Sequence, residues 1–374
     1  MNDKEKCCAR RKTSIGGQAL MEGIMMRGPV KNAMAVRRAN GEIFFEENLN
    51  EKKKRPAICR WPVVRGVFGF VDSMIIGYKA LMRSAEIAIE DEMAAEEKKD
   101  AEKTAQEAKT DAVTAEVTAA QELSAPAKKS DGEEKKGGIG KGAITAIMVL
   151  AGVLGVALAV GLFIWLPSFL YNLIANFTPE SWGLAGNRYL RSVFEGILKI
   201  FVLVLYMALV SLMKDIRRTF MYHGAEHKTI FCYEKGMPLT VENVKKQRRF
   251  HPRCGTSFLI LMLLVSIVLG MLIPPTFAGI NPTLYTVIRA AIKLLLIPVT
   301  MGIGYELLKF AGKHENIVTR IISAPGMWLQ RITVKEPTDD MIECAIKAFI
   351  AVLPDEEKEA EIAAADVDAQ NSEK

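Results

Sequence analysis

Two long stretches without a charged side chain limit the folds open to this chain more than any other feature. Residues 142–166 and 256–280 contain no Asp, Glu, Lys or Arg, although 25% of the whole chain is charged. An α-helix rises about 1.5 Å per residue, so about 20 apolar residues cross the hydrocarbon core of a bilayer. Segments 196–213 and 284–308 are nearly as apolar and carry one and three charged residues. The sequence therefore predicts an α-helical polytopic membrane protein with about four transmembrane helices.

The distribution of Lys and Arg predicts the orientation of these helices. The loop 214–255 holds ten of them, whereas the segment 167–195 holds two. Because basic loops are retained in the cytoplasm, we expect a multi-pass protein of the cell membrane with both termini and the loop 214–255 on the cytoplasmic side. The net charge of +6 then reflects this bias and attraction to the anionic surface of the lipid bilayer. No nucleic-acid-binding motif accompanies it, so no nucleic-acid partner is predicted.

Outside the apolar stretches, composition divides the chain further. The dipeptide Asn40-Gly41 favours a tight hairpin turn and lies between two extended runs, which predicts a small N-terminal β-rich unit. A stretch of Ala, Glu, Lys and Thr is typical of a solvated linker. The predicted parts are a β-rich cytoplasmic unit at 13–48, an amphipathic helical segment at 61–90, a low-complexity linker at 91–141, a four-span membrane domain at 142–313, a cytoplasmic or interfacial helical segment at 314–352 and an acidic tail at 355–374.

Two of the four histidines lie in the short stretch YHGAEHKTIFCYEKG, which follows the second predicted span. We expect that span to continue as one helix to Gly236, which is a natural helix end. On such a helix His223 and His227 share one face, with their Cβ atoms about 5–6 Å apart. Both imidazoles can then reach one metal ion at about 2.0–2.1 Å, and Glu226 can act as a general base beside it, as in the H-x-x-E-H order of some zinc peptidases.

A second fragment, RFHPRCGTSF, adds further metal ligands at the other end of the same loop. Pro252 and Gly255 favour an extended segment and a tight turn, so His251 and Cys254 can converge on one point. Together, His223, His227, His251 and Cys254 suit zinc or a neighbouring divalent transition metal. Four ligands would make a closed structural site, whereas three would leave a position for water with Glu226 as base. The alternative is that these side chains only cap helix ends and that the thiol is inert.

Three motifs, GGQALMEGIMMRGP, HGAEHKTIFCYE and HPRCGTSF, occur in this order, the first ahead of the predicted spans and the other two at the two ends of the loop 214–255. With these motifs the chain resembles the YqhQ-like family of bacterial polytopic membrane proteins, which are uncharacterised and are predicted to be metal-dependent enzymes. The resemblance extends from about Ile15 to Phe349 and excludes the linker 91–141 and the acidic tail. It implies the same site residues: His223, Glu226, His227, His251 and Cys254. The glycines of the first motif favour a backbone that something approaches closely, either an anionic headgroup or a packed neighbour.

Three functions follow as hypotheses. The first is a membrane-embedded, hydrolase-like metal-dependent enzyme that acts on a lipid headgroup or a peptide. The second is a non-enzymatic membrane assembly or scaffold protein with a structural metal or a hydrogen-bonded site. The third is a small transporter that uses Glu306, Arg289 and Lys293, for which a homo-oligomer remains open. A plainer interpretation has Arg289 and Lys293 snorkel to the membrane surface and Glu195 pair with Lys199 one helical turn away.

Overall fold

The computed structural model describes residues 13–50, 56–118, 141–179, 183, 187–274, 279–314 and 316–372. It divides into two compact units, one of residues 1–88 with 162–374 and the other of residues 89–161. The second unit holds the far part of the long helix α2 (Val64–Thr118) and helix α3 (Lys141–Val160). Most of the predicted linker 91–141 is thus helical up to Thr118, and its residues 119–140 lie outside the described residues.

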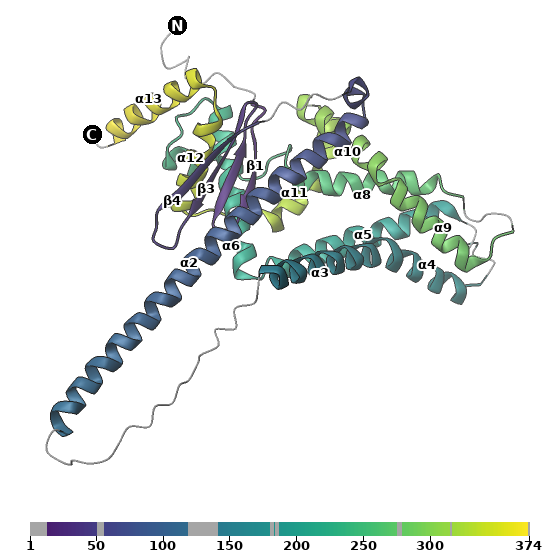
Figure 1. Cartoon of the computed structure of the whole chain (residues 1–374). Coiled ribbons are helices and arrows are strands. Elements are labelled where there is room, and N and C mark those ends of the chain that lie inside the picture. Colours follow the sequence, from purple (N-terminus) through teal and green to yellow (C-terminus); the bar gives the residue numbers. More distant parts are fainter. Residues whose placement is uncertain are drawn as a thin grey trace, which may run out of the picture. The chain divides into compact units, whose positions relative to one another are not determined.

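The first unit contains a four-stranded antiparallel sheet whose strands follow one another in chain order (Figure 1). The predicted N-terminal β-rich unit is therefore confirmed, and so is the hairpin turn, where Gly41 has a φ of +87°. Side chains alternate between the two faces, as expected for strands. Ile24, Met26 and Ala33 face one core, and Met25 and Met34 face another. The strands are β1 (Gly16–Leu20), β2 (Gly23–Arg27), β3 (Lys31–Arg37) and β4 (Ile43–Leu49).

Helices cover both faces of this sheet. The first core is shared with α6 (Lys214–Glu234), α7 (Val241–Lys245) and α12 (Asp339–Val352), and the second with α2 through Ile87, Ile76 and Ala80. Helix α12 begins after Thr338 with two acids in its first turn, as the sequence predicts. A short 3-10 turn (Ala57–Arg60) precedes α2, and α13 (Asp355–Ser372) follows α12. Helix α6 is thereby packed against β1, β2, α7 and α12.

The apolar segments form a second group of helices. A π-helical turn (Gly161–Trp165) leads into α4 (Leu166–Phe177), and α5 (Arg188–Val210), α8 (Gly255–Met271), α9 (Pro282–Leu295), α10 (Ile297–Lys313) and α11 (Ile317–Thr333) follow. Among the described residues, two helices are long and apolar enough to span a membrane, Leu150–Phe177 and Arg188–Val210. A third is obtained if α9 and α10, bent by 41°, count as one span, and α8 is a shorter apolar helix. The structure therefore supports two or three such helices where the sequence predicted four.

Prolines account for most of this difference. Pro298 lies at the start of α10 and cannot donate the backbone hydrogen bond that would continue α9 into α10, so the predicted span 284–308 bends. The predicted span 256–280 ends as a helix at Met271, three residues before Pro274. A further expectation is wrong: α5 does not run into α6, because Met213 adopts an extended conformation between them.

Helices α5 and α8 lie antiparallel along much of their length. Ser192 is next to Gly270, Gly196 would collide with Ile267 if it carried a Cβ, and Leu203 packs with Ile260. Successive contacts therefore move forward along α5 and backward along α8. The N-terminus of α8, at Cys254, and Ser192 therefore lie at opposite ends of this helix pair.

A buried ionic cluster occupies the Ser192 end of the bundle. Glu195 is 2% exposed and lies 3.1 Å from Arg191 Nε, 3.7 Å from Arg289 Nη2 and 2.5 Å from Lys293 Nζ. The snorkelling interpretation of Arg289 and Lys293 is therefore wrong, since Arg289 is 1% exposed. Glu195 pairs with these three cations and forms no such ion pair with Lys199 among the described residues. In lipid, a buried carboxylate is stabilised by partners of this kind.

Candidate metal site

Helix α6 carries the H-x-x-E-H motif, as the sequence predicts, and ends next to Gly236, which has a φ of +67°. Because four residues make slightly more than one helical turn, His223 and His227 lie on one face, with ring centroids 4.4 Å apart. The helix is pressed against a neighbouring segment at Gly224. A Cβ there would lie 2.0 Å from the carbonyl oxygen of Lys335, so only glycine allows this approach.

The second fragment meets this face of α6 at the start of α8. Cys254 is the N-cap residue of α8, and its Sγ lies 3.1 Å from His223 Nε2. The preceding residues are fixed by Gln330 of α11, which is fully buried. The Gln330 amide donates to the His251 carbonyl oxygen at 2.8 Å, and its oxygen accepts the His251 backbone N–H at 2.8 Å. This double hydrogen bond sets the position from which Cys254 reaches α6.

Three side chains bring metal-ligating atoms together: His223, His227 and Cys254 offer one atom each, and all three atoms lie within 4.8 Å of one another. The imidazoles are oriented by backbone carbonyls. His223 Nδ1 donates to the Thr333 oxygen at 3.0 Å, and His227 Nδ1 donates to the Arg249 oxygen at 2.5 Å. Since a carbonyl only accepts, each Nδ1 carries the hydrogen and each Nε2 presents a lone pair.

The Nε2 atom of His227 is buried and has no hydrogen-bond partner within the described residues. A buried polar atom without a partner costs free energy, so its presence calls for an explanation. A metal ion shared with the other two side chains supplies one, because two imidazoles and a thiolate are ligands that zinc prefers. The residues present therefore fit such an ion. Burial also lowers the pKa of His227, which favours the neutral ring that binds metals.

Glu226, the predicted base, lies in the same helix but is not one of the three grouped ligands. Its Oε1 accepts the backbone N–H of Gly17 in β1 at 2.9 Å. A Cβ on Gly17 would lie 2.9 Å from the Glu226 carboxyl carbon, so the close approach predicted for the glycine-rich stretch occurs here. Burial raises the pKa of Glu226, and the hydrogen bond from the Gly17 N–H opposes this effect.

His251, the fourth predicted ligand, lies beside the group but outside it. Its ring centroid is 5.6 Å from that of His227 and 4.6 Å from that of Phe231. Its Nε2 faces Glu234 Oε2 at 3.9 Å, which is too long for a hydrogen bond. Burial alone raises the pKa of Glu234, but His251 and Arg253 more than offset this effect and lower that pKa to about 2.

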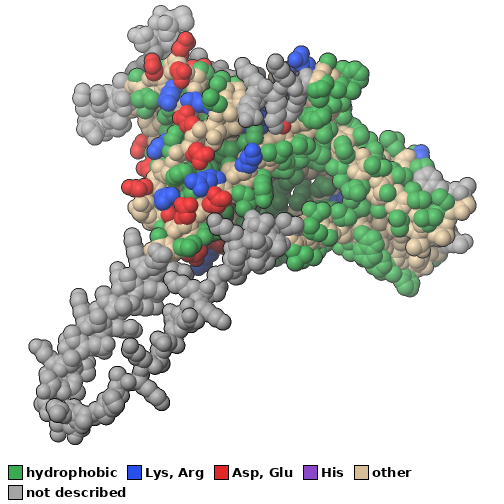
Figure 2. Space-filling view, in the orientation of Figure 1, with side chains coloured by type: hydrophobic (Ala, Val, Ile, Leu, Met, Phe, Trp, Pro, Cys, Tyr) green, Lys and Arg blue, Asp and Glu red, His purple; other side chains and the backbone are tan. Residues whose placement is uncertain are grey.

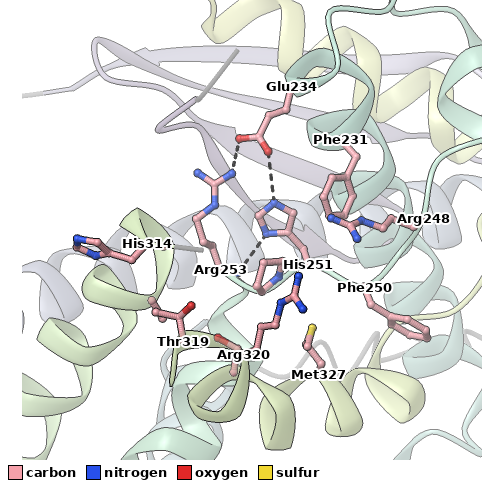
Figure 3. Close-up of a pocket in the computed structure, with 14 residues that line it drawn as sticks. Phe231, Glu234, Arg248, Phe250, His251, Arg253, His314, Thr319, Arg320 and Met327 are labelled. Carbon is pink, nitrogen blue, oxygen red and sulfur yellow. Dashed lines mark hydrogen bonds and ion pairs between the residues drawn. The ribbon is translucent and has the colours of Figure 1, made fainter. Parts of the chain in front are cut away.

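A cavity of about 260 Å³ opens on the other side of His251 (Figure 3). Its walls come from the end of α6, the segment before α8 and the helices α10 and α11. Phe231, Glu234, Arg248, His251, Arg253 and Arg320 are among the residues that line it. The rings of His223, His227, His251 and Phe231 thus form a row from the ligand group to this cavity.

The sequence analysis missed several residues on which the site depends. Gln330 and Thr333 act through contacts with residues about 80 to 110 positions away, and nothing in their own surroundings signals this role. Glu234 lies in the same stretch as the predicted ligands, but its partners His251 and Arg253 follow it by 17 and 19 positions. Gly17 was signalled as a position of close approach, but its partner Glu226 is not apparent from the sequence.

Comparison with known proteins identifies the family of this chain. Residues 61–355 match the family model described as "Protein of unknown function (DUF1385)". The uncharacterized protein YqhQ of Bacillus subtilis (strain 168) is 30% identical over 347 residues, which cover 91% of this chain and 92% of that protein. No solved structure matches the chain.

Proposed function

The chain belongs to the DUF1385 family and is YqhQ-like over 91% of its length, and we propose that it is a membrane-embedded, hydrolase-like metal-dependent enzyme. One observation carries the proposal: His223, His227 and Cys254 present three ligand atoms at one point, and His227 Nε2 has no other partner there. Catalytic zinc sites use three protein ligands and keep a fourth position open, whereas structural sites use four. His251 is directed towards Glu234 and does not complete the set.

The ion would supply Lewis acidity that polarises a carbonyl or phosphoryl oxygen of the substrate. The protein's own residues orient the two imidazole ligands and move a proton. The carbonyl oxygens of Thr333 and Arg249 hold both rings by Nδ1, so each Nε2 stays directed at the shared point. Gly17 holds one oxygen of Glu226, which leaves Oε2 to accept or return a proton.

We further propose that the site faces the cytoplasm at the inner surface of the cell membrane and that the chain crosses the membrane four times. Arg217, Arg218, Arg248, Arg249 and Arg253 all lie in the segment that holds the site, which supports the cytoplasmic side. Helix α8 runs antiparallel to the span candidate α5, so it returns across the bilayer if α5 crosses it. Hydrophobic side chains gather over the membrane helices, and charged ones over the sheet and α12 (Figure 2).

A second candidate is a membrane scaffold in which the same residues form a structural site. It is favoured by the hydrogen bonds of the site, which tie α6 to α11 through His223 and to the segment before α8 through His227. An ion bound to these three side chains would hold α6 to its neighbouring segments more firmly and would catalyse no reaction. In this case the metal would be present and Glu226 would have no catalytic role.

Metal analysis of the purified full chain tests the proposal. We expect about one transition-metal ion per chain, lost in His223→Ala, His227→Ala and Cys254→Ser. Two matched controls should keep it: His314→Ala, whose Nδ1 bonds only within its own helix, and Cys59→Ser, which is far from the group in sequence. A folded, metal-free wild-type protein after growth in metal-supplemented medium would refute the proposed enzyme.

Glu226→Gln separates the enzyme from the scaffold. Glutamine keeps an oxygen for the Gly17 N–H but cannot take a proton, so metal content and thermal stability should be unchanged. Turnover of a panel of fluorogenic carboxylic esters, phosphate esters and peptides should fall about 10²–10⁴-fold, the range for loss of a general base. Equal turnover in the wild type and the variant would favour the scaffold.

A further inference from the structure

We propose that the cavity beside His251 binds the phosphate group of the substrate, so that the enzyme acts on phosphate-bearing molecules, on a lipid headgroup or as a soluble phosphate ester. This inference rests on the proposed function, because it names a substrate class for that site. The cavity lies beside the ligand group, since His251 lines the cavity and its ring lies 5.6 Å from that of His227.

The charges that line the cavity are strongly unbalanced. Arg248, Arg253 and Arg320 face it, and Glu234 is the one carboxylate among its lining residues. Glu234 is already paired with Arg253, which also donates to the Thr13 carbonyl oxygen at 3.0 Å. The remaining two guanidinium groups therefore have no counter-charge in the cavity. An anion with more than one oxygen would supply it.

Arg248 and Arg320 also keep their hydrogen-bond donors available. Arg248 lies over the ring of Phe231 at 4.5 Å, which fixes its position without using its N–H groups. Neither side chain has a hydrogen bond or ion pair with a described residue. Figure 3 shows them entering the same space from different walls, Arg320 from α11 and Arg248 from the side of Phe231. Two arginines that converge in this way match the several oxygens of a phosphate.

A polar group beside them adds to this arrangement. Ser323 also lines the cavity from α11, and its hydroxyl makes no hydrogen bond to a described residue. A phosphate oxygen could accept from Ser323. The cavity thus holds unused donors as well as unbalanced positive charge.

Exposed apolar side chains of α11 support a position of the cavity near lipid headgroups. This helix exposes large apolar side chains next to Arg320, and Trp328 is 66% exposed. Such a surface, with tryptophan and arginine together, is typical of the membrane interface. The exposed apolar residues of α11 are Ile317, Val318, Ile321 and Trp328. A phosphate on a lipid headgroup and one on a soluble ester could both reach the cavity from this level.

Binding to the purified full chain in detergent tests the inference with three probes: inorganic phosphate, dihexanoyl phosphatidic acid and dihexanoyl phosphatidylcholine. We expect the wild type to bind phosphate or phosphatidic acid, and the double variant R248Q/R320Q to bind it about tenfold or more weakly, because two charge-assisted contacts are lost. R331Q, an exposed arginine of the same helix outside the cavity, is the matched control and should bind as the wild type does. R248K/R320K, which keeps the charge, should bind better than the glutamine variant.

The probes distinguish the sources of the phosphate. Tight binding of inorganic phosphate points to a soluble ester, and binding of phosphatidic acid alone points to a lipid headgroup. Equal affinity of the wild type and R248Q/R320Q, or no binding of either anionic probe by the wild type, would overturn the inference. Metal content, measured on the same samples, should be unchanged. Metal-free protein with arginine-dependent phosphate binding would refute the proposed enzyme and leave the binding site, whereas metal without such binding would refute only the inference.

Discussion

One hydrogen bond to each imidazole of α6 determines which of its ring nitrogens is free to bind a metal ion. His223 and His227 each give their Nδ1 hydrogen to a backbone carbonyl, which leaves the two Nε2 lone pairs and the Cys254 sulfur facing one point. Carbonyl partners of this kind fix the orientation of metal-binding histidines and raise their basicity. The backbone of α11 and of the segment before α8 therefore orients both imidazoles without the help of a bound ion.

The contact between Gly17 and Glu226 gives a prediction at this scale. Gly17→Ala places a methyl group 2.9 Å from the Glu226 side chain and from the sulfur of Met26, so both must shift. We expect a loss of about 1–3 kcal/mol in the free energy of unfolding, as for other overpacked sites. Thermal unfolding in detergent measures it. Gly16→Ala is the matched control, because nothing lies within 4 Å of its added carbon, and a similar loss in both variants would contradict the account.

Glu234 gives a prediction for pH. Its pKa in the folded protein is about 2, below the usual 4.5, so the unfolded chain binds the proton more readily. The pairing therefore stabilises the protein above about pH 4.5, and this stabilisation is lost as the pH falls towards 2. Because Glu234 keeps some solvent contact, we expect only about 1–2 kcal/mol. Unfolding of the wild type and Glu234→Gln should differ at pH 6 and converge near pH 2; a constant difference would contradict the prediction.

Residues whose role follows from helical spacing could be predicted from the sequence. His223 and His227 meet because a helix places residues four apart on one face, and Cys254 was found because its chemistry fits theirs. Gln330 could not be found in this way, since its partner lies 79 positions away and its own neighbours follow an ordinary amphipathic pattern. Long-range contacts depend on how elements pack, which local periodicity does not determine.

At the scale of elements, breaks in helices place the site. Helix α6 begins as a separate helix after the extended Met213, so its axis need not continue that of α5 and it can pack against the sheet. No proline or glycine occurs at residues 211–213, and the sequence therefore predicted a continuous helix. The bend between α9 and α10 could have been found, because Pro298 is a recognisable breaker. The hairpin at Gly41 and the start of α12 were predicted correctly, since both have strong local signals.

The cluster around Glu195 gives the prediction for these elements. Glu195→Gln leaves Arg191, Arg289 and Lys293 buried without their carboxylate, and loss of one partner of a buried ion pair costs about 3–5 kcal/mol. Thermal unfolding in detergent should show this loss. Glu86→Gln removes an exposed partner of Arg83 in an i,i+3 pair and should cost at most about 1 kcal/mol. Comparable effects of the two substitutions would show that the cluster does not hold α5 and α9 together.

At the scale of the whole molecule, the account requires that the site and the Glu195 cluster lie on opposite sides of the membrane. They lie at opposite ends of α8, whose 17 residues span about 25 Å. This distance is close to the thickness of a hydrocarbon core. The sheet and α12 then share one side with the site.

Labelling of single added cysteines with a membrane-impermeant maleimide tests this topology. Intact cells should label Tyr189→Cys and Thr283→Cys, which are exposed near the far ends of α5 and α9, but not Lys246→Cys near the site. Permeabilised cells should label all three, with the unsubstituted chain as the background. Protection of Thr283→Cys together with Lys246→Cys would mean that α8 does not cross the membrane.

The most direct test of the central claim is X-ray absorption spectroscopy of the zinc-loaded chain, with His251→Ala beside the wild type. We predict one sulfur at about 2.3 Å and nitrogen or oxygen atoms at about 2.0–2.1 Å that include two imidazoles, with the same spectrum in both proteins. Loss of one imidazole in His251→Ala would contradict the account, because His251 would then close the site as a fourth ligand.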